Sequence, residues 1–359
     1  MLKRLSTLAA LGAAVALSGP AQAQKADFAG KRIEWIIPFQ EGGGTDVWAR
    51  FIVGPLSREL PGKPTIIIRN VPGGGSTTGA NQFAQRAKPD GLTLLGTSGS
   101  TQFPYLLDDP RVKYDYKNWT ALLASPTGGV AYVRPELGIK NASEIKKILK
   151  EPMKYGSQGA TSLDLVPLLA FELLGLNVEP VFGMEGRGAG RLAFERGEAK
   201  IDYQTSSAYL KQVVPLVEQG RAVPLFAWGV IDENGNLQRD PTFPDLPHFG
   251  EAYEIVHGKK PEGPAFEALK AFIQAGFGAQ KALFVPKGTP KDVVEAYSQA
   301  IERVLKDPEF RKAAAEDLGD YDQYVGARSE RLVEQATTIS PEAKQWVKDW
   351  LTKKYNVKF

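Results

Sequence analysis

Three glycine-rich loops carry the residue types in this sequence that are best suited to binding chemistry. They cover residues 38–46 (PFQEGGGTD), 72–77 (PGGGST) and 156–162 (GSQGATS), and each lies between a strand-like run and a helix-like pattern. A glycine loop that opens a helix presents unpaired backbone N–H groups and the positive end of the helix dipole. Such a loop binds an anion without a basic side chain, so three of them predict capture of a small carboxylate.

The elements that must position these loops alternate between strands and helices. Strands are predicted at residues 33–38, 65–70 and 92–96, with helices at 47–60 and 78–87, a second α/β run over 142–228 and a mostly helical tail from residue 290. This order favours a parallel sheet with right-handed crossovers. Ligands of open α/β sheets bind beyond the carboxyl ends of the strands. The loops of the two α/β runs are therefore expected to face each other across a cleft.

The first residues of the chain predict a secretory signal. Lys3 and Arg4 form a positive segment, residues 8–17 an apolar segment and residues 21–23 an Ala-Gln-Ala motif, with cleavage expected after Ala23. The alternative, an uncleaved N-terminal anchor, fits the short apolar segment less well. No other apolar run is long enough to cross a bilayer, and the chain has no cysteine for a lipid anchor or a disulfide. We therefore expect a periplasmic protein.

Composition and charge exclude several classes of function. The formal net charge is +3, and removal of Lys3 and Arg4 with the signal lowers it by two, to +1. A near-neutral chain without a basic stripe argues against nucleic acid as a partner. The two histidines, His248 and His257, have no metal-ligand spacing, so no metal site is expected. The second loop departs from G-x-G-x-x-G and the chain lacks G-x-x-x-x-G-K-[ST], so no nucleotide cofactor is expected.

The order and spacing of several motifs resemble those of one known family. The motifs are IIPFxxGGGTDxxAR at residues 36–50, RNVPGGGxxxGA at 69–80, AKPDGLTL at 87–94, YGSxGxxS at 155–162, DPTFPDLP at 240–247 and FVPKGTP at 284–290. Together they cover nearly the whole chain after the predicted signal. They resemble the solute receptors of tripartite tricarboxylate transporters, the Bug family. No single motif is specific, whereas their order and spacing together are.

This resemblance implies the α/β fold of type II periplasmic binding proteins, with two lobes and a ligand cleft between them. Each lobe is expected to contain a mixed or parallel sheet flanked by helices. Residues 24–124 and 250–359 are expected to form lobe I, and residues 125–249 lobe II. The resemblance further implies a monomeric receptor, not an enzyme, that captures a small mono- or dicarboxylate and delivers it to the membrane permease of the transporter.

Candidate ligand-binding residues follow from the loops and from this resemblance. In lobe I they are Phe39, Gly42, Gly43, Gly44, Thr45, Asp46, Gly73, Gly74, Gly75, Ser76 and Ser98, and in lobe II they are Ser157, Gly159, Thr161, Ser162, Arg187 and Ser206. The glycines and hydroxyls are expected to offer N–H and O–H donors to a carboxylate, with plain turns and helix caps as the alternative. Asp46 is expected to brace its loop, because a bare carboxylate would repel an anionic ligand. Phe39 is expected either on the ligand's carbon skeleton or in the core of the lobe.

Two departures from the family pattern concern lobe II. Arg187 and Arg191 follow the strand at residues 178–182, and either could bind a second carboxylate of the ligand, although a solvated arginine is the favoured interpretation of each. The usual D-x-x-F-D-N of the family is DYQTSS at residues 202–207. A hydroxyl thus replaces the acidic or amide partner at Ser206, which argues against recognition of an amino group there.

Two other functions stay open on the sequence alone. An exported hydrolase needs a nucleophile elbow of the form G-x-S-x-G, and residues 96–100 (GTSGS) approach it without the final glycine. A receptor that reports to a sensor kinase instead of a permease would share the same ligand-binding fold, so sequence reasoning does not separate it from the transport receptor.

Overall fold

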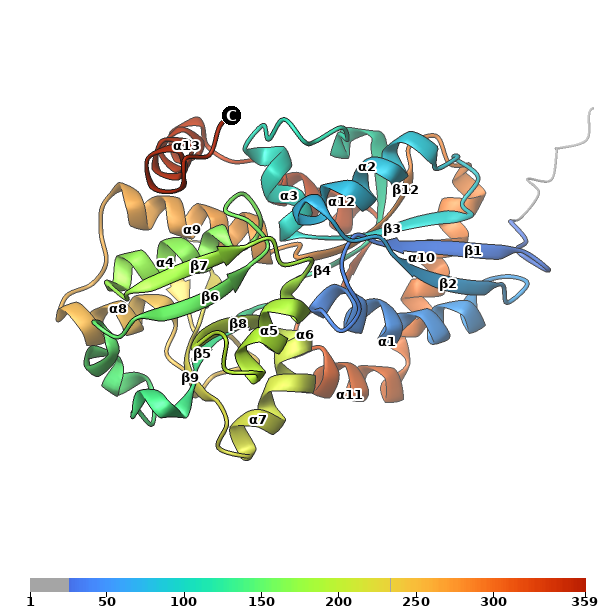
Figure 1. Cartoon of the computed structure of the whole chain (residues 1–359). Coiled ribbons are helices and arrows are strands. Elements are labelled where there is room, and N and C mark those ends of the chain that lie inside the picture. The colour runs from blue at the N-terminus through green and yellow to red at the C-terminus, as the bar shows by residue number, and fades with distance from the viewer. Residues whose placement is uncertain (1–25, 233) are drawn as a thin grey trace, which may run out of the picture.

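The computed structural model describes residues 26–232 and 234–359, and Figure 1 shows their arrangement. The predicted signal at residues 1–23 lies outside the described residues. The described residues form two lobes, each built on β-structure of its own, which confirms the expected mixed α/β class. None of the helices in these ranges combines the length and the apolar character that crossing a bilayer requires.

Lobe I contains a six-stranded sheet with the strand order β13-β4-β12-β3-β1-β2. Its strands are β1 (Arg32–Ile37), β2 (Thr65–Asn70), β3 (Thr93–Ser98), β4 (Trp119–Ser125), β12 (Lys281–Pro286) and β13 (Tyr324–Val325). The strand β1 pairs in parallel with both β2 and β3, as the alternation of strands and helices predicts. Isoleucine-rich runs favour β1 and β2 because β-branched side chains pack well on a pleated surface. The late strand β12 lies antiparallel between β3 and β4.

Helices cover both faces of this sheet. They are α1 (Gly44–Glu59), α2 (Thr77–Arg86), α3 (Gly99–Leu106), α10 (Lys291–Lys306), α11 (Pro308–Asp317) and α12 (Ala327–Ala336), with short 3₁₀ turns at Gly74–Ser76 and Tyr116–Asn118. Helix α1 shows how the sequence produces this packing. Trp48, Ile52 and Leu56 recur every four residues and are buried, so one stripe of the helix lies on the core of the lobe.

Lobe II contains a three-stranded sheet, β8-β5-β9, beside a parallel pair, β6-β7. Its strands are β5 (Gly129–Val133), β6 (Met153–Ser157), β7 (Val178–Phe182), β8 (Ile201–Thr205) and β9 (Val223–Ala227), with a small hairpin of β10 (Val230–Ile231) and β11 (Leu237–Gln238). Its helices are α4 (Leu165–Leu174), α5 (Arg187–Glu195), α6 (Ser206–Ala208) and α7 (Val214–Glu218), with 3₁₀ segments at Pro135–Leu137 and Ala142–Ile148 and a π-helical segment at Tyr209–Val213.

Three helices of the C-terminal part pack where the sequence did not predict them. They are α8 (Phe249–His257), α9 (Pro264–Phe277) and α13 (Pro341–Tyr355). Helices α8 and α9 lie against α4 and share its apolar core, and α13 lies on α9 (Figure 1). The expected start of lobe I at residue 250 is therefore wrong for these helices, because their apolar faces are buried chiefly in the core of lobe II.

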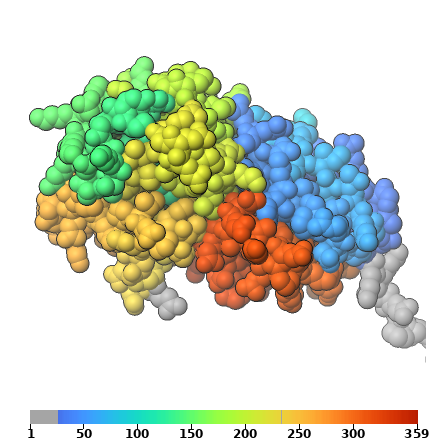
Figure 2. All heavy atoms as spheres, turned by 90° about the horizontal axis from the view of Figure 1, so that it is seen from below, coloured from blue at the N-terminus to red at the C-terminus, as the bar shows by residue number. Residues whose placement is uncertain are grey.

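Two crossing segments connect the sheets of the two lobes, and residues 337–340 lead from α12 on lobe I to α13 on lobe II. Residues 126–128 run from β4 to β5, and residues 278–280 run from α9 to β12. They lie side by side, since the backbone N–H of Thr127 donates to the carbonyl of Phe277 at 3.1 Å. On the face shown in Figure 2, the blue N-terminal segments of lobe I lie directly against the yellow-green segments of lobe II. The two lobes are thus in contact beyond their connections.

Candidate functional site

The candidate site is a small cavity between the two lobes. Its lining residues are Phe39, Gly43, Gly44, Thr45, Ser98, Ser100, Gln280 and Lys281 from lobe I and the crossing segment, and Gln158, Leu163, Arg187 and Thr205 from lobe II. None of these lining residues is acidic. The cavity has a volume of about 20 Å³, which is room for about one water molecule. Larger hollows occur elsewhere on the described surface, but this is where predicted loops of both lobes converge.

The first glycine loop enters the cavity at the start of helix α1. Gly43 is the N-cap residue of this helix, so the unpaired N–H groups of its first turn lie at the cavity. Asp46 is buried and is not among the lining residues of the cavity. Its carboxylate accepts from the N–H of Gly42 at 2.9 Å, from Nδ2 of Asn70 at 3.0 Å and from Nε of Arg50 at 2.9 Å. Asp46 therefore braces the loop, as its charge had suggested.

Glycines allow this loop to approach lobe II closely. A Cβ atom on Gly44 would lie closer than 3.0 Å to Oγ1 of Thr205 and 3.2 Å from Oγ of Ser207. The backbone itself forms bonds across the gap: Ser207 Oγ donates to the carbonyl of Gly44 at 3.0 Å, and Gln212 Nε2 donates to the carbonyl of Gly42 at 2.9 Å. The glycine run thus forms part of the contact surface between the two lobes.

A second part of lobe I reaches the cavity through the start of helix α3. Ser98 caps this helix by accepting from the N–H of Ser100 at 3.2 Å, and both serines line the cavity. Ser100 also bonds to lobe II, donating to Oε1 of Gln158 at 3.2 Å and accepting from the N–H of Leu163 at 3.3 Å. The contacts of Ser100 depend on residues about 60 positions away in lobe II.

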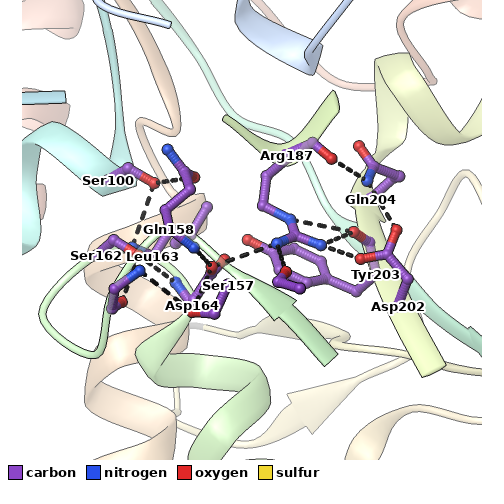
Figure 3. A network of polar contacts seen from close by, with 12 residues as sticks. Ser100, Ser157, Gln158, Ser162, Leu163, Asp164, Arg187, Asp202, Tyr203 and Gln204 are labelled. Carbon is purple, nitrogen blue, oxygen red and sulfur yellow. Dashed lines mark hydrogen bonds and ion pairs between the residues drawn. The ribbon is translucent and has the colours of Figure 1, made fainter. Parts of the chain in front are cut away.

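The lobe II loop is organised around a buried carboxylate that sequence reasoning missed (Figure 3). Asp164 accepts from Oγ of Ser157 at 2.9 Å and from the N–H of Gln158 at 2.6 Å. Ser162 Oγ donates to the carbonyl of Gly159 at 2.7 Å and accepts from the N–H of Asp164 at 3.2 Å. These serine hydroxyls therefore shape the loop, while Gln158 and Leu163 are its residues at the cavity.

The Thr161 hydroxyl forms a contact between the lobes outside the cavity. It donates to Oδ2 of Asp109 at 2.8 Å and accepts from Nη2 of Arg111 at 2.8 Å. Burial alone would raise the pKa of Asp109, but hydrogen bonds led by that of Arg111 hold it below its usual value. Thr161 thus meets an ionised partner from lobe I.

Arg187 lies at the cavity wall, but its charged group is already paired. Its guanidinium contacts Asp202 and, at 3.3 Å, Asp164 (Figure 3). It also lies 5.0 Å from the ring centre of Tyr155 and 4.7 Å from that of Tyr203. Burial opposes the charge, but the two carboxylates raise the pKa of Arg187 well above its usual value. The expectation of a solvated arginine is therefore wrong. Arg191 is paired with Glu195 and is not a lining residue.

Lys281 is the charged side chain at the cavity that sequence reasoning missed. It begins β12, is 3% exposed, and its Nζ lies 3.5 Å from Oγ1 of Thr205. Burial lowers the pKa of Lys281 well below its usual value. No local motif marks this lysine, because it reaches the cavity only when β12 is inserted between β3 and β4.

This geometry agrees with comparisons to known proteins. Residues 49–337 match the family model described as "Tripartite tricarboxylate transporter family receptor". The chain belongs to this receptor family. A UPF0065 protein of Bordetella pertussis is 29% identical over 317 residues, which are 86% of this chain and 85% of that protein.

Two solved structures share the receptor's fold. One, described as a periplasmic transporter, is 25% identical and has a TM-score of 0.67, with 91% of this chain and 98% of that chain covered. The other is MatC from Rhodopseudomonas palustris with bound malate, which is 22% identical and has a TM-score of 0.65, with 88% of this chain and 98% of that chain covered. The expected periplasmic binding protein fold is confirmed.

Several predicted residues of the receptor lie away from the cavity. Gly42, Asp46, Gly73, Gly74, Gly75, Ser76, Ser157, Gly159, Thr161, Ser162 and Ser206 are not among its lining residues. Ser76 Oγ donates to the carbonyl of Ser100 at 2.9 Å, so the second loop supports the start of α3. Ser206 lies at the crossing segments, where its hydroxyl accepts from the N–H of Gly128 at 3.1 Å. Phe39 lines the cavity and belongs to the core of lobe I, and its contact with a ligand stays a prediction.

The hydrolase alternative is wrong. The family consists of solute-binding receptors, and the receptor is not an enzyme. The histidines also have other partners: His248 accepts from the N–H of Gly250 at 3.0 Å as a helix cap, and His257 contacts the carbonyl of Leu173. Among the described residues, no group of three His, Cys, Asp or Glu side chains is placed to hold a metal ion.

Proposed function

We propose that this receptor captures a small organic carboxylate between its lobes in the periplasm and delivers it to a permease of the tripartite tricarboxylate type. The observation that carries the proposal is the cavity at which the starts of helices α1 and α3 meet lobe II without an acidic lining residue. Helix starts offer aligned N–H groups and a positive dipole end, and these favour a negatively charged ligand.

The proposed donors are fixed before a ligand arrives. Asp46 braces the loop of α1 and Asp164 braces the loop of lobe II, each by accepting backbone and side-chain hydrogen bonds. Each of these carboxylates accepts a hydrogen bond from its own loop. The N–H groups at the cavity therefore remain available to a ligand. We propose that Gly43, Gly44 and Ser98 donate to one carboxylate, with Gln158 opposite them. Preorganised donors add affinity because little ordering remains to be done on binding.

Entry requires the lobes to separate. A cavity of about 20 Å³ is smaller than any dicarboxylate. Hydrogen bonds on several sides of the cavity join the lobes, among them Ser207 Oγ to the carbonyl of Gly44, Ser100 Oγ to Oε1 of Gln158 and Thr161 Oγ1 to Oδ2 of Asp109. They break when the crossing segments bend and re-form around the ligand, which is the usual closure of two-lobed binding proteins.

Comparison with relatives supports the ligand class. MatC, with the same fold, was solved with bound malate, a dicarboxylate. The periplasmic location rests on the predicted signal at residues 1–23 and on the family, and the permease partner rests on the family.

The proposal is tested with the purified protein after the signal is removed. Native mass spectrometry identifies any co-purified solute, and titration calorimetry then measures binding of succinate, L-malate, adipate and benzoate. We expect at least one acid to bind at micromolar concentration and its neutral amide to bind at least about tenfold more weakly, since the site offers donors to a negative charge. If no acid binds, or if the amides bind equally well, the proposal is refuted.

A further inference from the structure

The side chain of Lys281 extends from lobe I to a strand of lobe II. Its backbone lies in β12, opposite Ser98 of β3 and Ser125 of β4. Its Nζ lies 3.5 Å from Oγ1 of Thr205 in β8, and 3.3 Å from the position that a Cβ would take on Gly44. With 3% of the residue exposed, the ammonium group is sealed between the two lobes at the cavity.

No acidic side chain in the described part of the chain compensates the charge of Lys281. Within the described ranges, no Asp or Glu oxygen lies within 4.0 Å of the Lys281 ammonium, whereas Arg187, the other charged lining residue, is paired with Asp164 and Asp202. A hydroxyl at 3.5 Å is the one hydrogen-bond partner of Lys281 in those ranges, at the limit of such a bond. The starts of α1 and α3 add further positive potential at the same point.

Further polar groups of the cavity also lack partners. The Nε2 atom of Gln158 and the Oε1 atom of Gln280 are buried lining groups without a hydrogen-bond partner in the described part of the chain. Buried polar groups are nearly always satisfied. Two such groups, one from lobe II and one from the crossing segment, line the cavity together with the Lys281 ammonium and its single long hydrogen bond. The three groups mark a place that a polar ligand completes, and the ammonium group sets the charge of that ligand.

We propose that Lys281 is the counter-ion of the ligand's carboxylate and that it makes closure of the lobes depend on an anion. This inference rests on the proposed function and adds the residue that sets the charge of the ligand. Sealing an ammonium group between the lobes without an anion is costly, because the group loses its hydration and gains only a hydroxyl. A carboxylate that enters with the lobes apart offsets this cost, so the closed form is favoured when an anion is bound and disfavoured when it is not.

The lowered pKa of Lys281 agrees with this geometry. Burial favours the neutral amine when no anion is near. Arg187, the other charged lining residue, is ion-paired with Asp164 and Asp202. A carboxylate beside Lys281 would restore its positive charge, since an opposite charge favours the ionised form.

The test compares the wild type with three variants, using charged and neutral probes. Lys281→Met removes the charge at nearly constant volume, and Lys281→Gln is a second neutral variant in case the first folds poorly. Lys287→Met is the matched control, because Lys287 belongs to the same region of the chain and is exposed. Calorimetry measures binding of sodium L-malate and sodium adipate and of their neutral diamides. Thermal unfolding of each unliganded protein is measured in parallel.

We expect both neutral variants at position 281 to bind the acid at least about 30-fold more weakly than the wild type, as for removal of one partner of a buried charge pair. The diamides should bind the wild type and these variants with similar affinity, and Lys287→Met should behave as the wild type. The unliganded Lys281→Met protein should unfold at an equal or higher temperature, since an unpaired buried charge has been removed.

The outcomes separate the two proposals. If the wild type binds no organic acid, the proposed function fails. If the wild type binds an acid and the position 281 variants bind it equally well, the function stands and the counter-ion is refuted. If these variants lose affinity for the acid and the diamide alike, Lys281 acts through the shape of the cavity and the counter-ion is again refuted.

Discussion

The substitution Gly44→Ala tests whether the lobes close on ligand in the way the structure describes. Gly44 is the first residue of α1, and its φ is not in the left-handed region, so alanine fits the backbone without strain. The added methyl group would meet Thr205 Oγ1 of lobe II at less than 3.0 Å, whereas ordinary contact begins at 3.4 Å. Within lobe I the methyl group would lie 3.3 Å from Nζ of Lys281, the far end of a flexible side chain that can move, whereas the closed pair of lobes must shift to accept it.

The expected magnitude follows from overpacking. Inserting a methyl group into a tightly packed contact costs about 1–3 kcal/mol. When this cost falls on the closed form alone, the affinity for the ligand decreases by about 5- to 150-fold, since about 1.4 kcal/mol corresponds to a factor of ten. The fold of each lobe should be little affected, because alanine is a better helix residue than glycine. We expect the unliganded melting temperature to change by no more than about 2 °C.

Titration calorimetry with the best-binding acid measures this loss, and Gly54→Ala serves as the control. Gly54 lies in the same helix, and its Cβ would meet only Arg58 Nη1, at 3.6 Å, so the affinity should be unchanged. The double variant Gly44→Ala/Thr205→Ala should recover part of the loss, because the clashing oxygen is removed. Wild-type affinity in Gly44→Ala would refute the described closure, since the methyl group would then have no lobe II contact to disturb.

Three further predictions concern charged groups in and around the site: Asp46, Arg187 and Asp109. Asp46→Asn should lower the free energy of unfolding by about 1–2 kcal/mol in urea denaturation, because the Asp46 carboxylate accepts three hydrogen bonds that hold the loop. An unchanged free energy of unfolding would contradict this role of Asp46. Arg187→Met should lower the free energy of unfolding by about 3–5 kcal/mol in the same assay, because Asp164 and Asp202 are left buried without their cationic partner. An unfolding midpoint close to that of the wild type would refute the importance of these ion pairs. The folded pKa of Asp109 is lowered, so its contribution to stability is complete above the ordinary value of 3.8 and is lost as the pH falls through the folded pKa. The difference in melting temperature between the wild type and Asp109→Asn should therefore shrink on acidification, and a difference that grows would contradict this sign.

Local sequence patterns identified the elements of lobe I well. Isoleucine-rich runs and the glycine loops that follow them predicted β1, β2 and the start of α1, because strand and turn preferences are decided by neighbouring residues. The bracing role of Asp46 was also predictable, since a carboxylate beside an anion-binding loop needs donors of its own. The strand β12 and the helices α8 and α9 were not predicted, because their apolar runs are decided by partners far away in the chain.

The sequence by itself determined the family, the α/β class and the glycine loops at the ends of strands, because each of these depends on motifs and preferences within short stretches of chain. Only the tertiary structure decided which loops reach the cavity, that Asp164 and Asp202 neutralise Arg187, and that Lys281 is left without an acidic partner among the described residues. The physical reason is that burial and charge pairing are properties of neighbours in space. Lys281 meets Thr205 across 76 positions of sequence, and no local pattern specifies that distance.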